Sequence, residues 1–367
     1  VRALAVDPKG DGAVAVLGRA VSRRWIDNPH PETNFRTLFL PVWYEGYAAP
    51  KWVWQSTGGS DAFEPKLSLW PLIFGTLKAT LYAMLFSVPL ALLAAIYVSQ
   101  LAPSWIQTIV KPTVELMAAV PSVVVGFLAA LWLAPRLESA LLAVFLCAVG
   151  LPLAVLISLA GWRMVPAPVR RTLPEGVELL LLLAAGVVVL GLAALMADPL
   201  EARFFAGDFQ RFLFTEWGLR YDQRNAIVVG LGLGFAVVPV IFTIAEDACS
   251  AVPQSLVTAS RALGATRWQT AIKMVVPAAS PGLFAAVMLG LGRAVGETMI
   301  VLMAAGNTPV LDLSLFNGMR TMSAAIAVEI PEAPVGGTLF RVLFLTGILL
   351  FAFTLVLTTA ADIVGSY

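Results

Sequence analysis

The stretch "AVPQSLVTASRALGATRWQTAIKMVVPAASPG" (residues 251–282) decides the fold of this chain, and we call it the elbow. Pro253 and Ser255 open a predicted short helix, with Ser255 as its candidate N-cap. Gly264 is expected to end that helix, and a second helix is predicted to follow it and to end at Pro277. Long apolar runs lie on both sides, so we expect the elbow to connect two membrane spans.

The first helix of the elbow carries small and apolar residues at helical spacing. They are Leu256, Ala259, Ser260 and Leu263, and Trp268 follows on the second helix. Such a narrow face suits a groove on a cytoplasmic partner. An ordinary connecting loop would explain the same residues, so the pattern alone allows both interpretations.

The composition places the chain in a membrane. Of its 367 residues, 59% are hydrophobic and 13% are charged, whereas about 25% of a soluble domain is charged. A helix needs roughly 20 apolar residues to cross a bilayer. The stretches that approach this length are 71–99, 114–134, 139–160, 178–197, 226–248, 281–305 and 341–363. We therefore predict an all-α integral membrane protein with about seven spans, preceded by a polar segment.

Basic residues in two loops indicate how the spans are oriented. Loop 161–177 carries Arg163, Arg170 and Arg171, and loop 249–280 carries Arg261, Arg267 and Lys273. Lys and Arg favour cytoplasmic loops, so both loops are predicted to face the cytoplasm. Because the span count is odd, residues 1–70 are then extracytoplasmic, and residues 71–367 form the transmembrane domain.

Two charges lie in the apolar stretch that follows the elbow. Arg293 and Glu297 are four residues apart, so on a helix they share one face and can pair. An unpaired charge at the centre of a span costs roughly 2.5–3.5 kcal/mol on insertion scales, which makes both residues functional candidates. Gly290, Gly292 and Gly296 permit close helix packing or leave room for a ligand, and both readings put the charges inside the bundle. A purely structural ion pair is the alternative.

Other polar positions are weaker candidates. Thr298 either lines the same face as the charged pair or bonds its own backbone. Ser122 follows Pro121, which is expected to interrupt a span and to lie near a transport path. Lys78 lies near the outer end of its span and is expected to extend its ammonium group toward the interface.

For Arg320 and Glu329 the sequence leaves two structural interpretations open, and the two cysteines give no sign of a functional site. Arg320 and Glu329 flank a predicted outer loop that either contacts a delivery protein or belongs to a re-entrant helix. Cys147 and Cys249 lie in apolar runs and are interpreted as buried small side chains rather than a disulfide or a metal pair. The chain has no G-x-x-x-x-G-K-[ST] motif, so any nucleotide that drives it is bound by another subunit. We predict no catalytic residue, metal site or nucleic-acid partner.

The elbow resembles the EAA loop of ABC importer permeases. In that loop E-A-A, three further residues and a glycine lead into a helix that ends in I-x-L-P. The matching positions are Thr258, Ala259 and Ser260 for E-A-A, Gly264 for the glycine, and Met274, Val276 and Pro277 for the end. Thr258 replaces the glutamate, which removes any contact of that charge but keeps the small-residue face. The resemblance implies that an ATPase contacts Ser255, Leu256, Thr258, Ala259, Ser260, Leu263, Gly264, Ala265 and Trp268.

Further motifs resemble the permeases of bacterial ABC phosphate importers, and they lean toward the PstC type over the PstA type. They are "LGRAVGET" (291–298), "AAVPSVVVGF" (118–127), "FGTLKATL" (74–81) and "GMRTMSAAIAVEIPEAP" (318–334). The resemblance implies a type I ABC importer permease-like helical bundle in the bacterial inner membrane. Relative to the usual form, residues 136–225 look inserted, with an extra helical hairpin, and residue 1 begins after the place of the usual first span.

The resemblance also implies partners and a role for the charged pair. The partners are a PstA-like second permease, a PstB-like ATPase dimer that binds ATP and Mg²⁺, and a PstS-like binding protein that delivers phosphate. Arg293 would bind phosphate oxygens, while Glu297 would either hold Arg293 when the path is empty or accept a hydrogen bond from a protonated phosphate oxygen. An importer for another oxyanion, such as phosphonate, tungstate or sulfate, a secondary anion transporter, and a phosphate sensor are the rival functions.

Overall fold

The computed structural model describes residues 3–6, 12–17, 20–25, 33–58, 64–166 and 177–365. It divides into two compact units, one of Val1–Trp70 with Ala333–Val342 and one of Pro71–Glu332 with Leu343–Tyr367. Arg170 and Arg171, on which the predicted orientation partly rests, lie outside the described residues.

The first unit contains short strands. β1 (Ala3–Val6), β2 (Gly12–Leu17) and β3 (Ala20–Trp25) form an antiparallel sheet in that order. Helix α1 (Phe35–Phe39) begins with a capping box in which Asn34 accepts a hydrogen bond from the backbone of Thr37 at 3.0 Å. β4 (Trp54–Gln55) and β5 (Lys66–Leu67) form a second antiparallel pair. No strands were predicted from the sequence, because runs of two to six residues are too short to give a clear period-two pattern.

In the described part of the chain, seven helical segments are long and apolar enough to cross a membrane, which confirms the predicted number. They are α2 (Trp70–Ile96) continued by the π-helical η1 (Tyr97–Leu101); α4 (Ser122–Phe127) with η2 (Leu128–Leu133) and α5 (Ala134–Ser139); α6 (Leu141–Met164); α8 (Val177–Phe204); α10 (Ala226–Ser250); α12 (Arg267–Thr270) with η3 (Ala271–Val275) and α13 (Val276–Gly296); and α16 (Thr338–Gly365). Shorter helices are α3 (Ser104–Ala119), α9 (Phe209–Trp217), α11 (Gln254–Ala262), α14 (Met299–Ala304) and α15 (Met322–Glu329).

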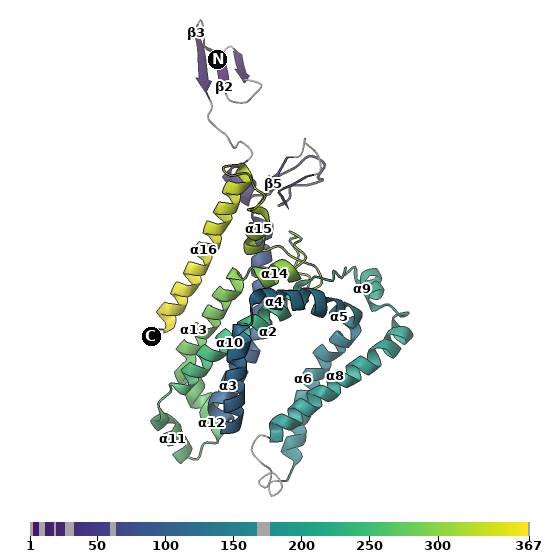
Figure 1. The fold of residues 1–367 in the computed structure, drawn as a ribbon, viewed down its shortest axis with the longest axis vertical. Helices are drawn as coiled ribbons and strands as arrows, with labels where there is room; N and C mark the ends of the chain where they lie inside the picture. Colours follow the sequence, from purple (N-terminus) through teal and green to yellow (C-terminus); the bar gives the residue numbers. More distant parts are fainter. Residues whose placement is uncertain are drawn as a thin grey trace. The chain divides into compact units, whose positions relative to one another are not determined.

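Two predicted spans have different boundaries in the structure. The stretch 114–134 is not one helix, because α3 ends at Ala119 and α4 begins at Ser122, where Figure 1 shows the chain turning sharply. The stretch 281–305 ends early, at Gly296, and its helix begins much earlier, at Arg267. Hydropathy locates apolar residues but does not detect a break in the backbone between them.

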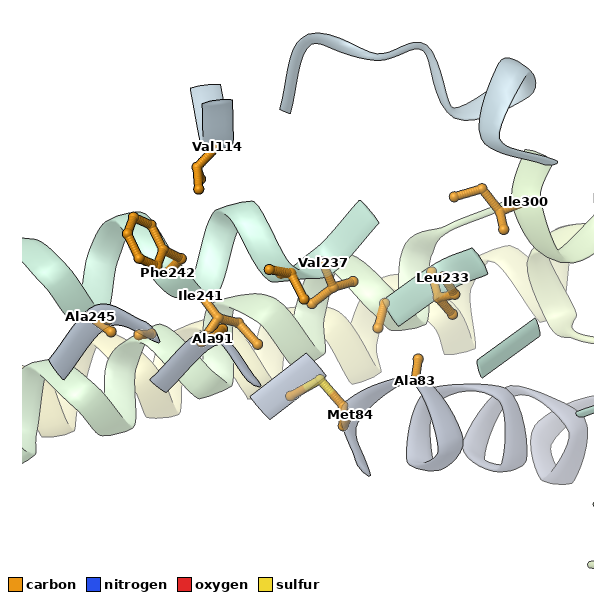
Figure 2. Close-up of a cluster of buried hydrophobic side chains, with 14 of the residues drawn as sticks. Ala83, Met84, Ala91, Val114, Leu233, Val237, Ile241, Phe242, Ala245 and Ile300 are labelled. Carbon is orange, nitrogen blue, oxygen red and sulfur yellow. The ribbon is translucent and has the colours of Figure 1, made fainter. Parts of the chain in front are cut away.

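Helix α10 is the centre of the core in the second unit. It packs against α13, α3 and α14, and Figure 2 shows its side chains meeting those of α2. Leu233, Val237 and Ile241 are completely buried. Close approach to α2 depends on glycine, because a Cβ at Gly234 would lie 2.6 Å from the ring of Phe86.

Helices α6 and α8 form an antiparallel hairpin, seen in Figure 1, whose members pack mainly on each other. Most of their side chains are exposed on the surface of the chain. A small apolar cluster joins the hairpin to α9, and it includes Leu141, Leu142, Phe209 and Leu213. Cys147 in α6 and Cys249 in α10 are both free thiols.

Candidate functional site

Arg293 lies in the last turn of α13, and its side chain is exposed. The helix ends at Gly296, and Glu297 has extended backbone angles (φ −67°, ψ 128°), so the expected i, i+4 geometry does not exist. Among the described residues, neither side chain makes an ion pair. The prediction that they pair is therefore wrong, and in this chain alone Arg293 is exposed and Glu297 is half-buried. The carbonyl groups at the end of α13 favour a cation there by about 0.3–1 kcal/mol.

The break after α13 is fixed by hydrogen bonds to the backbone. Ser323 Oγ donates to the carbonyl oxygen of Glu297 at 2.9 Å, which ties the break to α15. Thr298 Oγ1 donates to the carbonyl oxygen of Gly296 at 3.3 Å, so this hydroxyl bonds its own backbone. Helix α14 then starts at Met299. Ser323 was not predicted as a site residue, since its partner lies 26 residues away in the chain.

Ser122 begins the helix that follows the second break. Pro121 occupies the N-cap position of α4, as expected for a proline that interrupts a span, and Ser122 is half-buried. Helix α4 packs closely on α14, because a Cβ at Gly126 would lie 3.0 Å from the carbonyl oxygen of Met299. The two interrupted segments therefore meet, although the described residues show no hydrogen bond between Ser122 and Arg293.

The three glycines of α13 that were predicted to allow close packing have different surroundings. A Cβ at Gly290 would lie 2.4 Å from Ile241 Cγ1, so this position allows α13 to approach α10. At Gly292 the nearest group is the methyl carbon of Thr358 in α16, at 3.8 Å. A Cβ at Gly296 would meet no atom within 4 Å, so packing does not require this glycine and there is open space near Arg293.

Helix α15 is held by a buried ion pair. Arg320 Nη2 and Glu329 Oε1 lie 2.5 Å apart, and both side chains are largely buried. A Cβ at Gly75 of α2 would lie only 2.1 Å from the backbone carbonyl oxygen of Arg320. Helix α2 and the segment at Arg320 are therefore in very close contact. Of the two alternatives for Arg320 and Glu329, the structure favours the packed helix over an exposed contact for a delivery protein.

Lys78 is buried, although it was expected to reach the interface. Its Nζ donates to the carbonyl oxygen of Asn317 at 3.4 Å, and Tyr82 on the next turn of α2 donates to the carbonyl oxygen of Leu313. Asn317 in turn donates to the carboxylate of Asp312. The prediction was wrong because a loop 239 residues further along the chain covers this part of α2 and supplies the acceptor.

The elbow lies at the other end of α13. Ser255 is not the N-cap of α11, since Pro253 occupies that position without a side-chain cap. Gly264 follows the end of α11 with φ +87°, the left-handed conformation expected at a helix C-terminus. Pro277 does not end the second helix, which continues from Arg267 to Gly296. The wider π-helical turn of η3 lies just before Pro277, where the missing N–H of proline would otherwise disturb the helix.

The elbow exposes most of its predicted docking residues. Leu263 is 90% exposed and Trp268 is 57% exposed, and Ala259 is also exposed. Ser260 Oγ and Thr270 Oγ1 lie 3.1 Å apart and join the two helices of the elbow. Val257, which the sequence analysis did not single out, is buried in the main core and anchors α11.

A second ion pair lies close to the elbow. Lys111 on α3 and Glu246 on α10 are 3.1 Å apart, and Glu246 is buried. Ser250 Oγ donates to the same carboxylate at 2.8 Å. Because Ser250 ends α10 just before the elbow, this pair fixes the helix from which the elbow begins.

These features define a class of protein. The described part of the chain has a bundle of membrane spans, one of which rises from an exposed elbow and carries an exposed arginine in its last turn. Residues 87–366 match the model of the "binding-protein-dependent transport system inner membrane component", and the chain belongs to this family. The predicted family is thereby confirmed. The chain is a multi-pass inner-membrane protein and a permease subunit of an ABC transporter.

The chain is also similar to individual permease proteins. The probable ABC transporter permease protein YqgH of Bacillus subtilis is 28% identical over 78% of this chain and 68% of its own length. The phosphate transport system permease protein PstC of Haemophilus influenzae is 30% identical over 77% of this chain and 70% of its own. PstC of Mesorhizobium japonicum is 26% identical over 90% and 87%. Among solved structures, an inward-facing form of the MetNI methionine ABC transporter covers 81% of this chain and 93% of its own at 16% identity, with a TM-score of 0.42.

Proposed function

We propose that this chain is the PstC-type permease subunit of an ATP-driven phosphate importer. The names of the Haemophilus and Mesorhizobium relatives support phosphate as the substrate. The observation that carries the proposal is Arg293, which is exposed and unpaired among the described residues, on the span that starts at the elbow.

An exposed arginine on a membrane span needs a polar environment. Ionisable residues in spans face other helices or water-filled cavities rather than lipid. Arg293 would therefore face a path that a PstA-like second permease completes. The planar guanidinium offers paired donors to two phosphate oxygens, and the open space near Gly296 leaves room for them. Glu297, half-buried just beyond the helix, would accept a hydrogen bond from a protonated phosphate oxygen.

The elbow would connect this path to ATP hydrolysis. A PstB-like ATPase dimer, which binds ATP and Mg²⁺, would dock on the exposed Leu263 and Trp268, and a PstS-like protein would deliver phosphate at the outer face. The helix from Arg267 to Gly296 is continuous and, at 1.5 Å per residue, about 45 Å long. A displacement of the elbow would therefore move Arg293. The chain itself would carry out no chemistry.

Reconstitution tests the transport role. Proteoliposomes with this chain, the second permease and the ATPase should take up phosphate only when ATP and the binding protein are present. Arg293→Gln should abolish uptake and leave assembly intact. Arg203→Gln is the matched control, because Arg203 is also exposed in the last turn of a long membrane helix. Uptake by the chain alone under an ion gradient, or normal uptake by Arg293→Gln, would contradict the proposal.

A second experiment tests docking. Leu263→Glu and Ala259→Trp should each abolish co-purification of the ATPase while the permease remains folded. Val335→Glu is the control, because Val335 is 89% exposed but lies far from the elbow in sequence. Retention of the ATPase by both elbow variants would show that the elbow is an ordinary connecting loop.

A further inference from the structure

Helix α9 lies between two consecutive membrane spans. Helix α8 ends at Phe204, α9 runs from Phe209 to Trp217, and α10 begins at Ala226. The connection between two consecutive spans stays on one side of the bilayer. Phe204 and Phe209 are separated by five Cα-to-Cα steps of at most about 3.6 Å each, so α9 begins within about 18 Å of the end of α8. The helix is therefore confined to the neighbourhood of one membrane surface.

The orientation of α9 is fixed at both ends. Asp208 accepts a hydrogen bond from the backbone N–H of Arg211 at 2.8 Å, and Glu201 accepts one from the backbone N–H of Phe209 at 2.7 Å. Gly218 ends the helix in the left-handed conformation, with φ +64°. Asp208 and Glu201, an acid of α8, thus cap the N-terminus of α9, and the bond to Glu201 limits rotation of α9 about its axis.

One side of α9 is buried and a neighbouring side is aromatic and exposed. Phe209 and Leu213 are buried in the cluster that joins α9 to the hairpin. Phe214 and Trp217, three residues apart and so on adjacent turns of one edge, are each 60% exposed. The apolar surface of α9 is therefore wider than the part that the protein covers.

Polar residues lie beside the aromatic edge of α9. Arg211 and Thr215 are four residues apart and exposed, and at 100° per residue they lie about 120° and about 160° around the axis from Trp217, with Arg211 about 60° from Phe214. Exposed aromatic rings with an arginine and a threonine beside them suit the boundary between acyl chains and headgroups, where tryptophan and arginine gather.

We propose that α9 is an interfacial anchor that lies in the headgroup layer of the bilayer. Phe214 and Trp217 contact the upper acyl chains, and Arg211 faces the lipid phosphates and water. Through Phe209 and Leu213, this anchor holds the α6–α8 hairpin at a fixed depth. The inserted segment 136–225 thus has a lipid partner of its own, independent of phosphate transport.

Spin labels test whether position 214 faces lipid and position 215 faces water. The background chain has both native cysteines removed (Cys147→Ser and Cys249→Ala). One variant then carries Phe214→Cys and a second carries Thr215→Cys, and each is labelled with a nitroxide and placed in vesicles of phosphatidylethanolamine and phosphatidylglycerol. We expect the label at 214 to be relaxed several-fold more by oxygen than by a water-soluble nickel chelate, and the neighbouring label at 215 to show the reverse. Equal exposure of both labels to the chelate would overturn the proposal. Protection of the label at 214 from both reagents would also overturn it, because it would indicate a protein partner.

Photo-crosslinking gives a second test of lipid contact, in a chain that keeps both native cysteines. A benzophenone amino acid at position 214 should form adducts with phospholipid that mass spectrometry detects, and the same group at 215 should form several-fold fewer. Adducts of position 214 with another protein in place of lipid would contradict the assignment.

Discussion

Helices α10 and α8 have nearly the same hydropathy, yet their surroundings differ. Of the residues in the apolar window of each span, 61% are buried in α10 and 11% in α8. Glycine explains much of the difference, because Gly230, Gly232 and Gly234 each leave room for a neighbouring helix at α10. In α8 a Cβ at Gly191 would meet nothing within 4 Å. Hydropathy therefore identifies a span, whereas the placement of small residues indicates which span forms the core.

The largest expected difference in the free energy of unfolding is between breaking a buried ion pair in the core and breaking an exposed one near the α6–α8 hairpin. Glu329→Gln leaves the largely buried Arg320 without its counter-charge, which should lower the free energy of unfolding by about 3–5 kcal/mol. The exposed pair of Arg220 and Asp222, which follows α9, is the control. Asp222→Asn should cost less than about 1 kcal/mol. Unfolding by a denaturing detergent in mixed micelles measures the stability of both variants. Equal losses would show that the buried pair contributes no more than the exposed pair.

Glycine contacts should give the next largest effect. Gly75→Ala puts a methyl group onto the backbone carbonyl of Arg320, and since a backbone group cannot turn aside, we expect a loss of about 3 kcal/mol. Gly191→Ala in α8 meets open space and should be neutral or stabilise the helix by up to about 1 kcal/mol. Thermal unfolding in detergent compares the two. A tolerated Gly75→Ala would show that the backbone at Arg320, just before α15, moves away from α2 more easily than the contact indicates.

Leucine truncation compares α10 and α8 directly. Leu233 in α10 is fully buried, and Leu195 in α8 is 75% exposed. Leu233→Ala should cost about 2 kcal/mol, at the low end for a buried leucine, because lipid is as apolar as the core and mainly the lost packing counts. Leu195→Ala should change the free energy of unfolding by less than about 0.5 kcal/mol. A large loss at Leu195 would mean that the hairpin packs against another chain.

Particular residues show how far the sequence could predict this molecule. The spans, the break at Pro121 and the turn at Gly264 follow from local rules on apolar length, proline and glycine, and all are present. The pairing of Arg293 with Glu297 also rested on a local rule, but it failed because the backbone leaves the helix at Glu297. The burial of Lys78 and the bond from Ser323 to Glu297 depend on partners far away in the chain, which no local pattern contains.

The smallest of these effects concerns the bond that ties α15 to the break beside Arg293. Ser323→Ala removes the hydroxyl that donates to the carbonyl of Glu297, which should cost about 1 kcal/mol. Ser139→Ala is the control, because within the described part of the chain the Ser139 hydroxyl bonds only the carbonyl of Arg136 in its own helix. This substitution should change stability by a few tenths of a kcal/mol. Hydrogen exchange should show the added loss of protection at residues 297–304 in Ser323→Ala alone. If exchange there matches the unsubstituted protein, α15 does not hold the break, and other contacts fix the backbone beside Arg293.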